Sequence, residues 1–119
     1  MANDPSEIMN LSGSWRIRKA ADDAETVYIS EKFGVRTLHI GSDTVQSAMR
    51  INAPNDLEIS YTRSMMGFLL FLEKPQSVLM VGLGGGSVAK FIYHHMPWTK
   101  IRVIEVNERV LTVAQRYFH

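Results

Sequence analysis

The chain has 119 residues, the size of one small domain or of part of a larger protein. Its composition, 45% hydrophobic and 21% charged, is that of an ordinary soluble globular protein, and a net charge of +1 excludes the strong positive field of a nucleic-acid or anionic-membrane binder. Cysteine is absent, which excludes disulfides and thiolate metal sites and agrees with a reducing cytoplasm.

Neither the polar N-terminal residues nor the most apolar stretch of the chain resembles a targeting or membrane segment. The first residues, "MANDPSEIMN", are polar and acidic, unlike a signal peptide. The most apolar stretch, "MMGFLLFL", is far shorter than the ~20 residues that a membrane-spanning helix needs. We therefore expect a cytoplasmic protein with no membrane or nucleic-acid partner.

The first half of the chain predicts antiparallel β-structure. Residues 1–24 are polar, and we expect a loosely ordered segment in which "WRIRK" could form a short strand. Two runs rich in β-branched and aromatic residues, 27–30 and 35–40, flank a turn at Gly34 and predict a β-hairpin. "TVQSAMRI" can add a third strand, so residues 25–53 are predicted to be a small β domain.

A helix is predicted after the break at Pro54. Asn55 could cap it, with Glu58 completing a capping box, and the helix would run to about Leu72. Its second half is apolar on nearly every face, so burial is expected, with Met65, Met66, Phe68 and Phe71 as core residues.

The rest of the chain alternates strands and helices. The expected order is a strand at 77–82, a helix at 86–96, a strand at 100–106 and a helix at 107–118. The first strand is continuously apolar, as expected of a central parallel strand covered on both faces. Residues 54–119 are thus predicted to begin a doubly wound parallel sheet, which makes the fold class α/β with an N-terminal antiparallel β unit.

Glycines interrupt the chain where the first of these strands becomes a helix. The loop contains Gly82, Gly84, Gly85 and Gly86, whose missing side chains allow a ligand to reach backbone N–H groups at the positive end of the helix. Glu105 ends the next strand, where an acid can accept hydrogen bonds from two ribose hydroxyls. The combination predicts a nucleoside-containing ligand; the alternative is a tight turn with an exposed glutamate.

The glycine spacing leaves the kind of nucleoside open. Residues 84–89 satisfy the dinucleotide pattern G-x-G-x-x-A, whereas residues 82–86 satisfy the G-x-G-x-G of adenosylmethionine enzymes. Dehydrogenases commonly begin at this unit, but here a β-hairpin and a helix come first.

Taken together, residues 27–119 resemble the aminopropyltransferases of the spermidine synthase family, in particular divergent bacterial members. "GSDTVQSAMR" resembles the family's Val-Gln-Ser-Ser stretch, which implies that Gln46 contacts the nucleoside, and "SYTRSMM" resembles the start of its Tyr-His-Glu helix, which implies a substrate contact for Tyr61. "VLMVGLGGGS" resembles the Gly-Gly-Gly-Asp-Gly-Gly loop and "VIEVN" the Val-Glu-Ile-Asp segment, which implies that Glu105 binds the ribose.

The resemblance implies a β domain followed by a Rossmann-like, methyltransferase-type domain that binds decarboxylated S-adenosylmethionine or methylthioadenosine. It implies aminopropyl transfer to a small amine in polyamine biosynthesis, and a homodimer. Family members continue well beyond the equivalent of His119 and there carry the aspartate that deprotonates the amine. We therefore expect an N-terminal portion that is inactive alone, and we assign no catalytic residue in it.

Two departures from the family pattern keep other functions open. Gly85 replaces an aspartate and Thr62-Arg63 replaces His-Glu, so negative charge is lost from a site expected to hold cations. An S-adenosylmethionine-dependent methyltransferase and a non-catalytic nucleoside-binding or assembly module are the alternatives, with a nicotinamide dehydrogenase a distant fourth. No metal site is predicted, because the side chains of the adjacent His94 and His95 would point about 100° apart on a helix.

Overall fold

A computed structural model describes residues 7–9, 15–17 and 26–119 of the chain. Within the polar first segment it contains two short strands, β1 (Glu7–Met9) and β2 (Trp15–Ile17), which pair in antiparallel fashion. The strand expected within "WRIRK" is therefore β2. The expectation of loose order for the remainder of 1–24 falls on residues outside the described ones.

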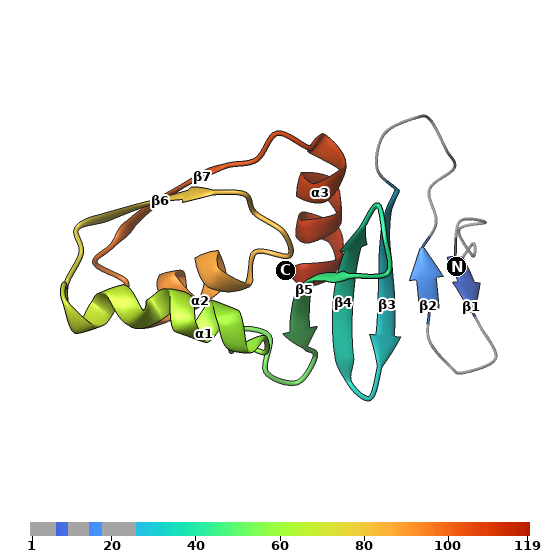
Figure 1. Ribbon diagram of the computed structural model, residues 1–119, viewed down its shortest axis with the longest axis horizontal. Coiled ribbons are helices and arrows are strands. Elements are labelled where there is room, and N and C mark those ends of the chain that lie inside the picture. Colours follow the sequence, from blue (N-terminus) through green and yellow to red (C-terminus); the bar gives the residue numbers. More distant parts are fainter. Residues whose placement is uncertain (1–6, 10–14, 18–25) are drawn as a thin grey trace.

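The predicted antiparallel unit is confirmed as a three-stranded sheet in the order β3-β4-β5 (Figure 1). Its strands are β3 (Val27–Lys32), β4 (Val35–Ile40) and β5 (Val45–Arg50). The hairpin turn uses positive φ angles at Phe33 and Gly34, 51° and 74°. Between β4 and β5 the register shifts, because Leu38 pairs with Ser47 but His39 pairs with Val45. Gln46 is the extra residue of this irregularity.

One face of this sheet is covered by the last helix of the chain. That helix is α3 (Glu108–Val113), continued by a π-helical turn, η2 (Ala114–Phe118). As predicted, Asn107 begins it: the Asn107 side chain accepts a hydrogen bond from the backbone N–H of Arg109 at 3.0 Å. The core under the helix is a cluster of six buried side chains, namely Val27, Ile29, Leu38, Met49, Val110 and Phe118.

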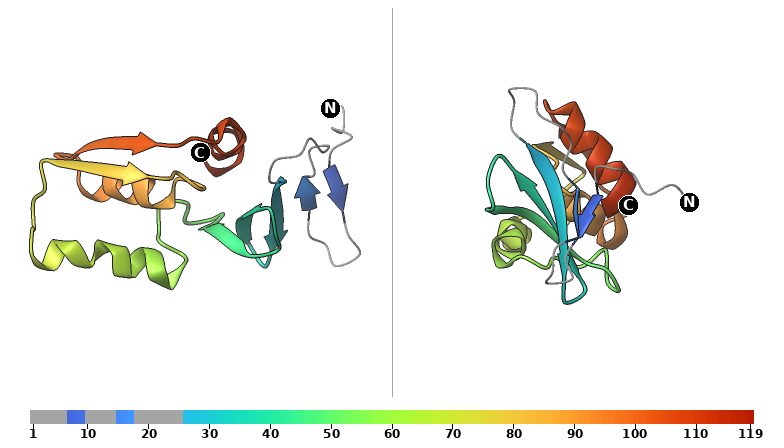
Figure 2. Two further views of the ribbon diagram at one scale, coloured as in Figure 1. Left: turned by 45° about the horizontal axis from the view of Figure 1, so that its top comes forward. Right: turned by 90° about the vertical axis from the view of Figure 1, so that its right-hand side faces the viewer.

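The second half has the predicted strand–helix–strand–helix order and confirms the α/β fold class. Its parallel strands are β6 (Ser77–Val81) and β7 (Lys100–Ile104), joined by α2 (Ser87–His95). Before them come α1 (Ser60–Met65) and a 3-10 turn, η1 (Met66–Leu70). Figure 2 shows α2 between the parallel pair and α1, so these elements form three layers. A second apolar cluster, built on Leu57, Val88, Ile92 and Met96, fills the space between them.

The expectation that the first parallel strand is covered on both faces was wrong for the described residues. Val78 and Met80 pack against the cluster around α2, but the alternate residues Leu79 and Val81 are 63% and 83% exposed. Side chains alternate across a strand, so a single layer of helices covers only every second residue. The outer face of β6 and β7 is therefore exposed, with the apolar side chains of Leu79, Val81 and Ile104 beside the charged Lys100 and Arg102.

The helix expected at 55–72 is shorter than predicted. It begins at Ser60, and its N-cap position, Ile59, provides no side-chain cap. The carboxylate of Glu58 instead forms an ion pair with Arg50 on β5, so no capping box is made with Asn55. A tertiary contact has overridden a local pattern.

Burial of the second half of that helix was also overestimated. Met66 and Phe68 do pack on the second cluster, but Met65 is 52% and Phe71 is 91% exposed, and the neighbouring leucines are exposed as well. The change to 3-10 geometry at Met66 turns the apolar residues out of helical register, so fewer of them face α2. Among the described residues, no helix is long and apolar enough to cross a membrane.

Candidate functional site

The glycine loop connects β6 to α2 through three glycines in left-handed conformations. Gly82, Gly84 and Gly86 have φ angles of 89°, 55° and 75°, a region that residues with a Cβ rarely adopt. Gly86 is the N-cap of α2, and its N–H donates to the carbonyl of Leu83 at 3.0 Å. The sequence G-x-G-x-G is thus explained by the path of the backbone from strand into helix.

Gly85 is glycine for a different reason. It is buried, and a Cβ added to it would lie 2.8 Å from both Phe118 Cδ1 and Ser47 Oγ. The space in front of Gly85 is therefore filled by η2 and β5. Gly85, which the resemblance places where the family would carry an aspartate, is thus a packing contact in this chain.

Glu105 follows β7 and ties the glycine loop to the start of α3. One carboxylate oxygen accepts from the backbone N–H of Leu83 and the other from that of Asn107, both at 2.8 Å. These hydrogen bonds lower the pKa of Glu105 below its usual value. The N–H of Leu83 contributes most, and the N–H of Asn107 contributes next. The carboxylate is thus ionised at neutral pH. The N–H groups of Val106 and Gly84 contribute further to the lowered pKa of this carboxylate.

Gln46 and Tyr61, the other two predicted contacts, lie beside each other. The Tyr61 hydroxyl donates to the backbone carbonyl of Gln46 at 3.2 Å, and both residues are exposed. Gln46 is followed by Ser47, which lies next to Gly84 and Gly85. The structure therefore connects Gln46 and Tyr61 to the glycine loop through β5, and Glu105 to the same loop through Leu83. The described contacts contain no direct bond between Glu105 and either Gln46 or Tyr61.

Four residues that connect the glycine loop to β5 and η2 were not predicted from the sequence as part of the site. Ser87, at the start of α2, donates to the carbonyl of Ala48 at 3.2 Å and lies 3.4 Å from Ser47 Oγ. Lys90 donates to the carbonyl of Phe118, and burial lowers the pKa of its amine. Ser47 and Ser87 directly follow Gln46 and the glycines, so their positions in the motifs could have indicated them. Phe118 and Lys90 carry no local signal, because their partners are distant in the sequence.

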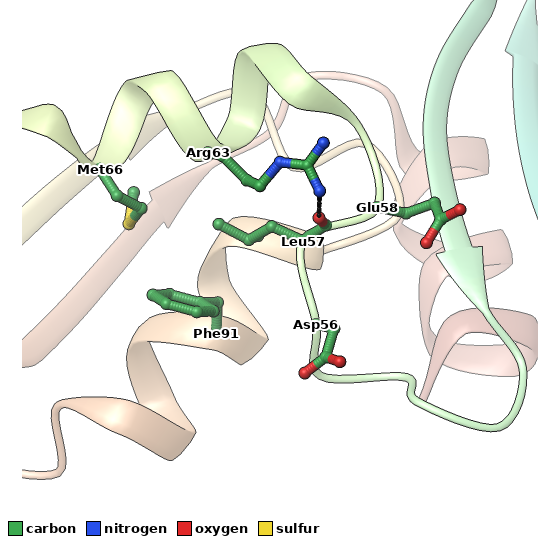
Figure 3. A pocket seen from close by; sticks show the side chains of 6 residues that line it. All are labelled: Asp56, Leu57, Glu58, Arg63, Met66 and Phe91. Atoms are coloured by element: carbon green, nitrogen blue, oxygen red, sulfur yellow. Dashed lines mark hydrogen bonds between the residues drawn. The ribbon is translucent and has the colours of Figure 1, made fainter.

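Thr62 and Arg63, which the resemblance places where the family would carry His-Glu, have structural roles here. Thr62 is buried and its hydroxyl donates to the carbonyl of Ile59. Arg63 donates to the carbonyl of Leu57 at 3.3 Å and lines a pocket with Met66 and Phe91 (Figure 3). That pocket contains none of the predicted nucleoside contacts, so Arg63 belongs to a different surface.

Comparison with known proteins identifies relatives of this chain. It is 44% identical over 103 residues to a polyamine aminopropyltransferase of Chromobacterium violaceum and 43% identical over 104 residues to one of Neisseria meningitidis. Each match covers 87% of this chain and 40% of the relative, so the chain spans about 40% of their length. No family model matches the chain.

Two further matches are a short sequence match to a methyltransferase and a structural match to a spermidine synthase. The eEF1A lysine and N-terminal methyltransferase of Mus musculus is 43% identical over 49 residues, which is 41% of this chain and 7% of that protein. Among solved structures, a probable spermidine synthase from Corynebacterium glutamicum superposes with a TM-score of 0.64 at 14% identity, over 92% of this chain and 40% of that one. The latter likeness confirms the fold, and the sequence relatives give the family: the chain belongs to the polyamine aminopropyltransferase, or spermidine synthase, family.

Proposed function

We propose that this chain is the nucleoside-binding part of a spermidine synthase-like aminopropyltransferase. Decarboxylated S-adenosylmethionine, or the product methylthioadenosine, would lie over the loop formed by Gly82 and residues 84–86, with its ribose on Glu105. The observation that supports this most directly is the Glu105 carboxylate, held at the end of β7 by the N–H groups of Leu83 and Asn107.

The state of Glu105 suits a ribose. The carboxylate is ionised, and its orientation is fixed before a ligand arrives, so little side-chain freedom is lost on binding. A ribose presents two neighbouring hydroxyl donors, and an ionised carboxylate is an acceptor for such donors. Gln46 and Tyr61 would contact the rest of the ligand from β5 and α1.

The reaction of the complete protein is part of the same proposal. Aminopropyl transfer requires a base, because an amine with a pKa near 10 must lose its proton before it attacks carbon. Glu105 is already committed to the loop, so we assign no catalytic residue in this chain and expect the isolated chain to be inactive. A small amine as acceptor, polyamine biosynthesis as the process, a dimeric state and a cytoplasmic location are likewise proposed.

A methyltransferase is the second candidate, and a specific observation favours it. The short match to the eEF1A lysine and N-terminal methyltransferase covers 41% of this chain. In addition, Gly85 provides no carboxylate to pair with the ammonium group of an aminopropyl chain. Intact S-adenosylmethionine would then be the co-substrate.

Calorimetric titration of the chain with methylthioadenosine tests the nucleoside site. We expect Glu105→Gln to weaken binding about 10- to 100-fold, because a hydrogen bond to a charged group contributes about 1.5–3 kcal/mol. Glu108→Gln, an exposed acid in the first turn of α3, is the matched control and should bind nearly as the unchanged chain does. Absence of binding to the unchanged chain, or equal losses in both variants, would contradict the proposal.

Co-substrate choice separates the two candidate reactions. Tighter binding of decarboxylated than of intact S-adenosylmethionine favours aminopropyl transfer, and the reverse favours methyl transfer. A rise in melting temperature with NAD but not with methylthioadenosine would instead indicate a dehydrogenase. Turnover by the isolated chain would exclude a purely non-catalytic module.

A further inference from the structure

A pocket separate from the glycine loop opens between the segment before α1, α1 itself and α2. Its volume is about 430 Å³, within the range of small-molecule sites. Six residues line it, three of them charged and three apolar: Asp56, Leu57, Glu58, Arg63, Met66 and Phe91. Figure 3 shows Arg63 and Asp56 on opposite sides of the Leu57 side chain.

The three charges of the pocket are not equivalent. Glu58 is neutralised by Arg50, whose Nε donates to one carboxylate oxygen at 3.0 Å and whose terminal nitrogen donates to the other. Among the described residues, Asp56 has no ion-pair partner. Arg63 likewise has no acidic partner among them, and its side chain donates to the uncharged carbonyl of Leu57. Within the part of the chain that the structure describes, the pocket therefore keeps one anion and one cation that have no ion-pair partner.

Apolar side chains line the rest of the pocket, and that of Leu57 lies between Asp56 and Arg63 (Figure 3). Leu57 is 7% exposed and belongs to the core under α2, and Met66 and Phe91 are half-buried beside it. The ring of His95 packs against that of Phe91 with centroids 4.4 Å apart, which holds the Phe91 ring in place. The floor of the pocket is thus preformed and can contact a short hydrocarbon segment.

We propose that this pocket binds a small zwitterion, an amino carboxylate with its ammonium and carboxylate groups at the two ends of an apolar chain. The ammonium pairs with Asp56, the carboxylate pairs with Arg63, and the chain between them covers Leu57, Met66 and Phe91. This site is independent of the nucleoside site and does not rest on the function proposed for it.

The charge pattern selects a zwitterion over either of its singly charged analogues. A simple amine pairs with Asp56 but places no anion beside Arg63. A simple carboxylate pairs with Arg63 but places no cation beside Asp56. Each exposed ion pair contributes up to about 1 kcal/mol, or about fivefold in affinity. The zwitterion should therefore bind several-fold more tightly than either analogue, and salt should weaken the preference.

The test is an NMR titration of the isotopically labelled chain with three probes, ε-aminocaproate, caproate and n-hexylamine. We expect ε-aminocaproate to shift the signals of Met66 and Phe91 and to bind about three- to fivefold more tightly than the other two. Binding of caproate or n-hexylamine as tight as that of ε-aminocaproate would overturn the proposal. Shifts confined to the glycine loop would overturn it as well.

Charge-removing variants provide the second arm. Asp56→Asn should bring the affinity for ε-aminocaproate down to that for caproate, and Arg63→Gln should bring it down to that for n-hexylamine. Glu73→Gln and Arg102→Gln, exposed charges outside the pocket, are the matched controls and should leave the affinity unchanged. Since all four positions are exposed, the variants should fold. Equal effects in the pocket variants and the controls would contradict the assignment.

Discussion

The antiparallel sheet β3–β5 and the parallel pair β6–β7 differ in how completely they are covered. One face of the antiparallel sheet β3–β5 is sealed by α3 and η2, and Leu38 and Phe118 there have no exposed surface. The parallel pair β6–β7 has α2 on one face only, and Leu79 and Val81 are exposed on the other. Parallel sheets are normally covered on both faces. The glycine loop lies where these two regions meet. Its geometry depends on the more completely covered antiparallel sheet, because Gly85 packs against Phe118 and Ser47.

Phe118 is the residue through which the two regions are most tightly joined. It is fully buried in the core of the antiparallel sheet, touches the position of Gly85 and has its carbonyl bonded to Lys90 of α2. We expect Phe118→Ala to lower the free energy of unfolding by about 3–5 kcal/mol, because a large cavity is left in a packed core. Urea unfolding followed by circular dichroism measures the change.

Phe71→Ala is the control for that substitution. Phe71 is 91% exposed, so the same truncation there should change stability by less than about 0.5 kcal/mol. Equal losses for the two variants would show that Phe118 of η2 does not join the two regions.

Gly85 gives the next largest effect. A Cβ at this position would lie 2.8 Å from Phe118 and Ser47, so Gly85→Ala should destabilise the chain by about 1–3 kcal/mol through overpacking. Gly67→Ala is the matched control, since a Cβ there meets nothing within 4 Å, and it should be neutral or slightly stabilising. The cost of Gly85→Ala should shrink in the Phe118→Ala background, and full additivity would contradict the contact.

The exposed outer face of β6 and β7 predicts that copies of this chain associate with one another. Leu79 and Val81 form an apolar surface with Ile104, and such surfaces bind one another in water. Leu79→Lys combined with Val81→Lys should weaken self-association by about tenfold or more, measured by sedimentation velocity. Val78→Lys, on the inner face, should instead unfold the chain because it buries a charge. A chain that is monomeric without any substitution would show that this face is not adhesive.

Local patterns were sufficient for much of the fold. Runs rich in β-branched and aromatic residues predicted β3 and β4, and the glycines followed by Glu105 predicted the loop and its partner acid. These signals lie within one strand or one turn. What failed depended on distant contacts: Glu58 pairs with Arg50 rather than capping a helix, and Phe71 finds no layer to cover it.

The same division holds for the site. The positive φ angles of Gly82, Gly84 and Gly86 are demanded by the chain path and are readable from the sequence. The packing of Gly85 against Phe118 is not readable, because it depends on how α3 returns to the antiparallel sheet. The resemblance in the motif therefore located the loop, but it did not reveal why Gly85 has no side chain.

The smallest predicted effect concerns the pH dependence of the joint between Glu105 and the loop. Backbone N–H groups lower the pKa of Glu105 in the folded chain, whereas in the unfolded chain it is near 4.3. A lowered folded pKa gives stability that is present above the unfolded pKa and is lost as the pH falls through the folded one. Glu105→Gln should therefore be less stable than the unchanged chain at pH 7, by about 0.5 kcal/mol because solvent screens the group, and this gap in the free energy of unfolding should close below about pH 4.

Glu73→Gln, an exposed acid in a loop, should show no such gap in the same pH series of urea unfolding curves. If the gap for Glu105→Gln instead widened on acidification, the carboxylate would be held protonated, and it could not be the ribose acceptor of an aminopropyltransferase.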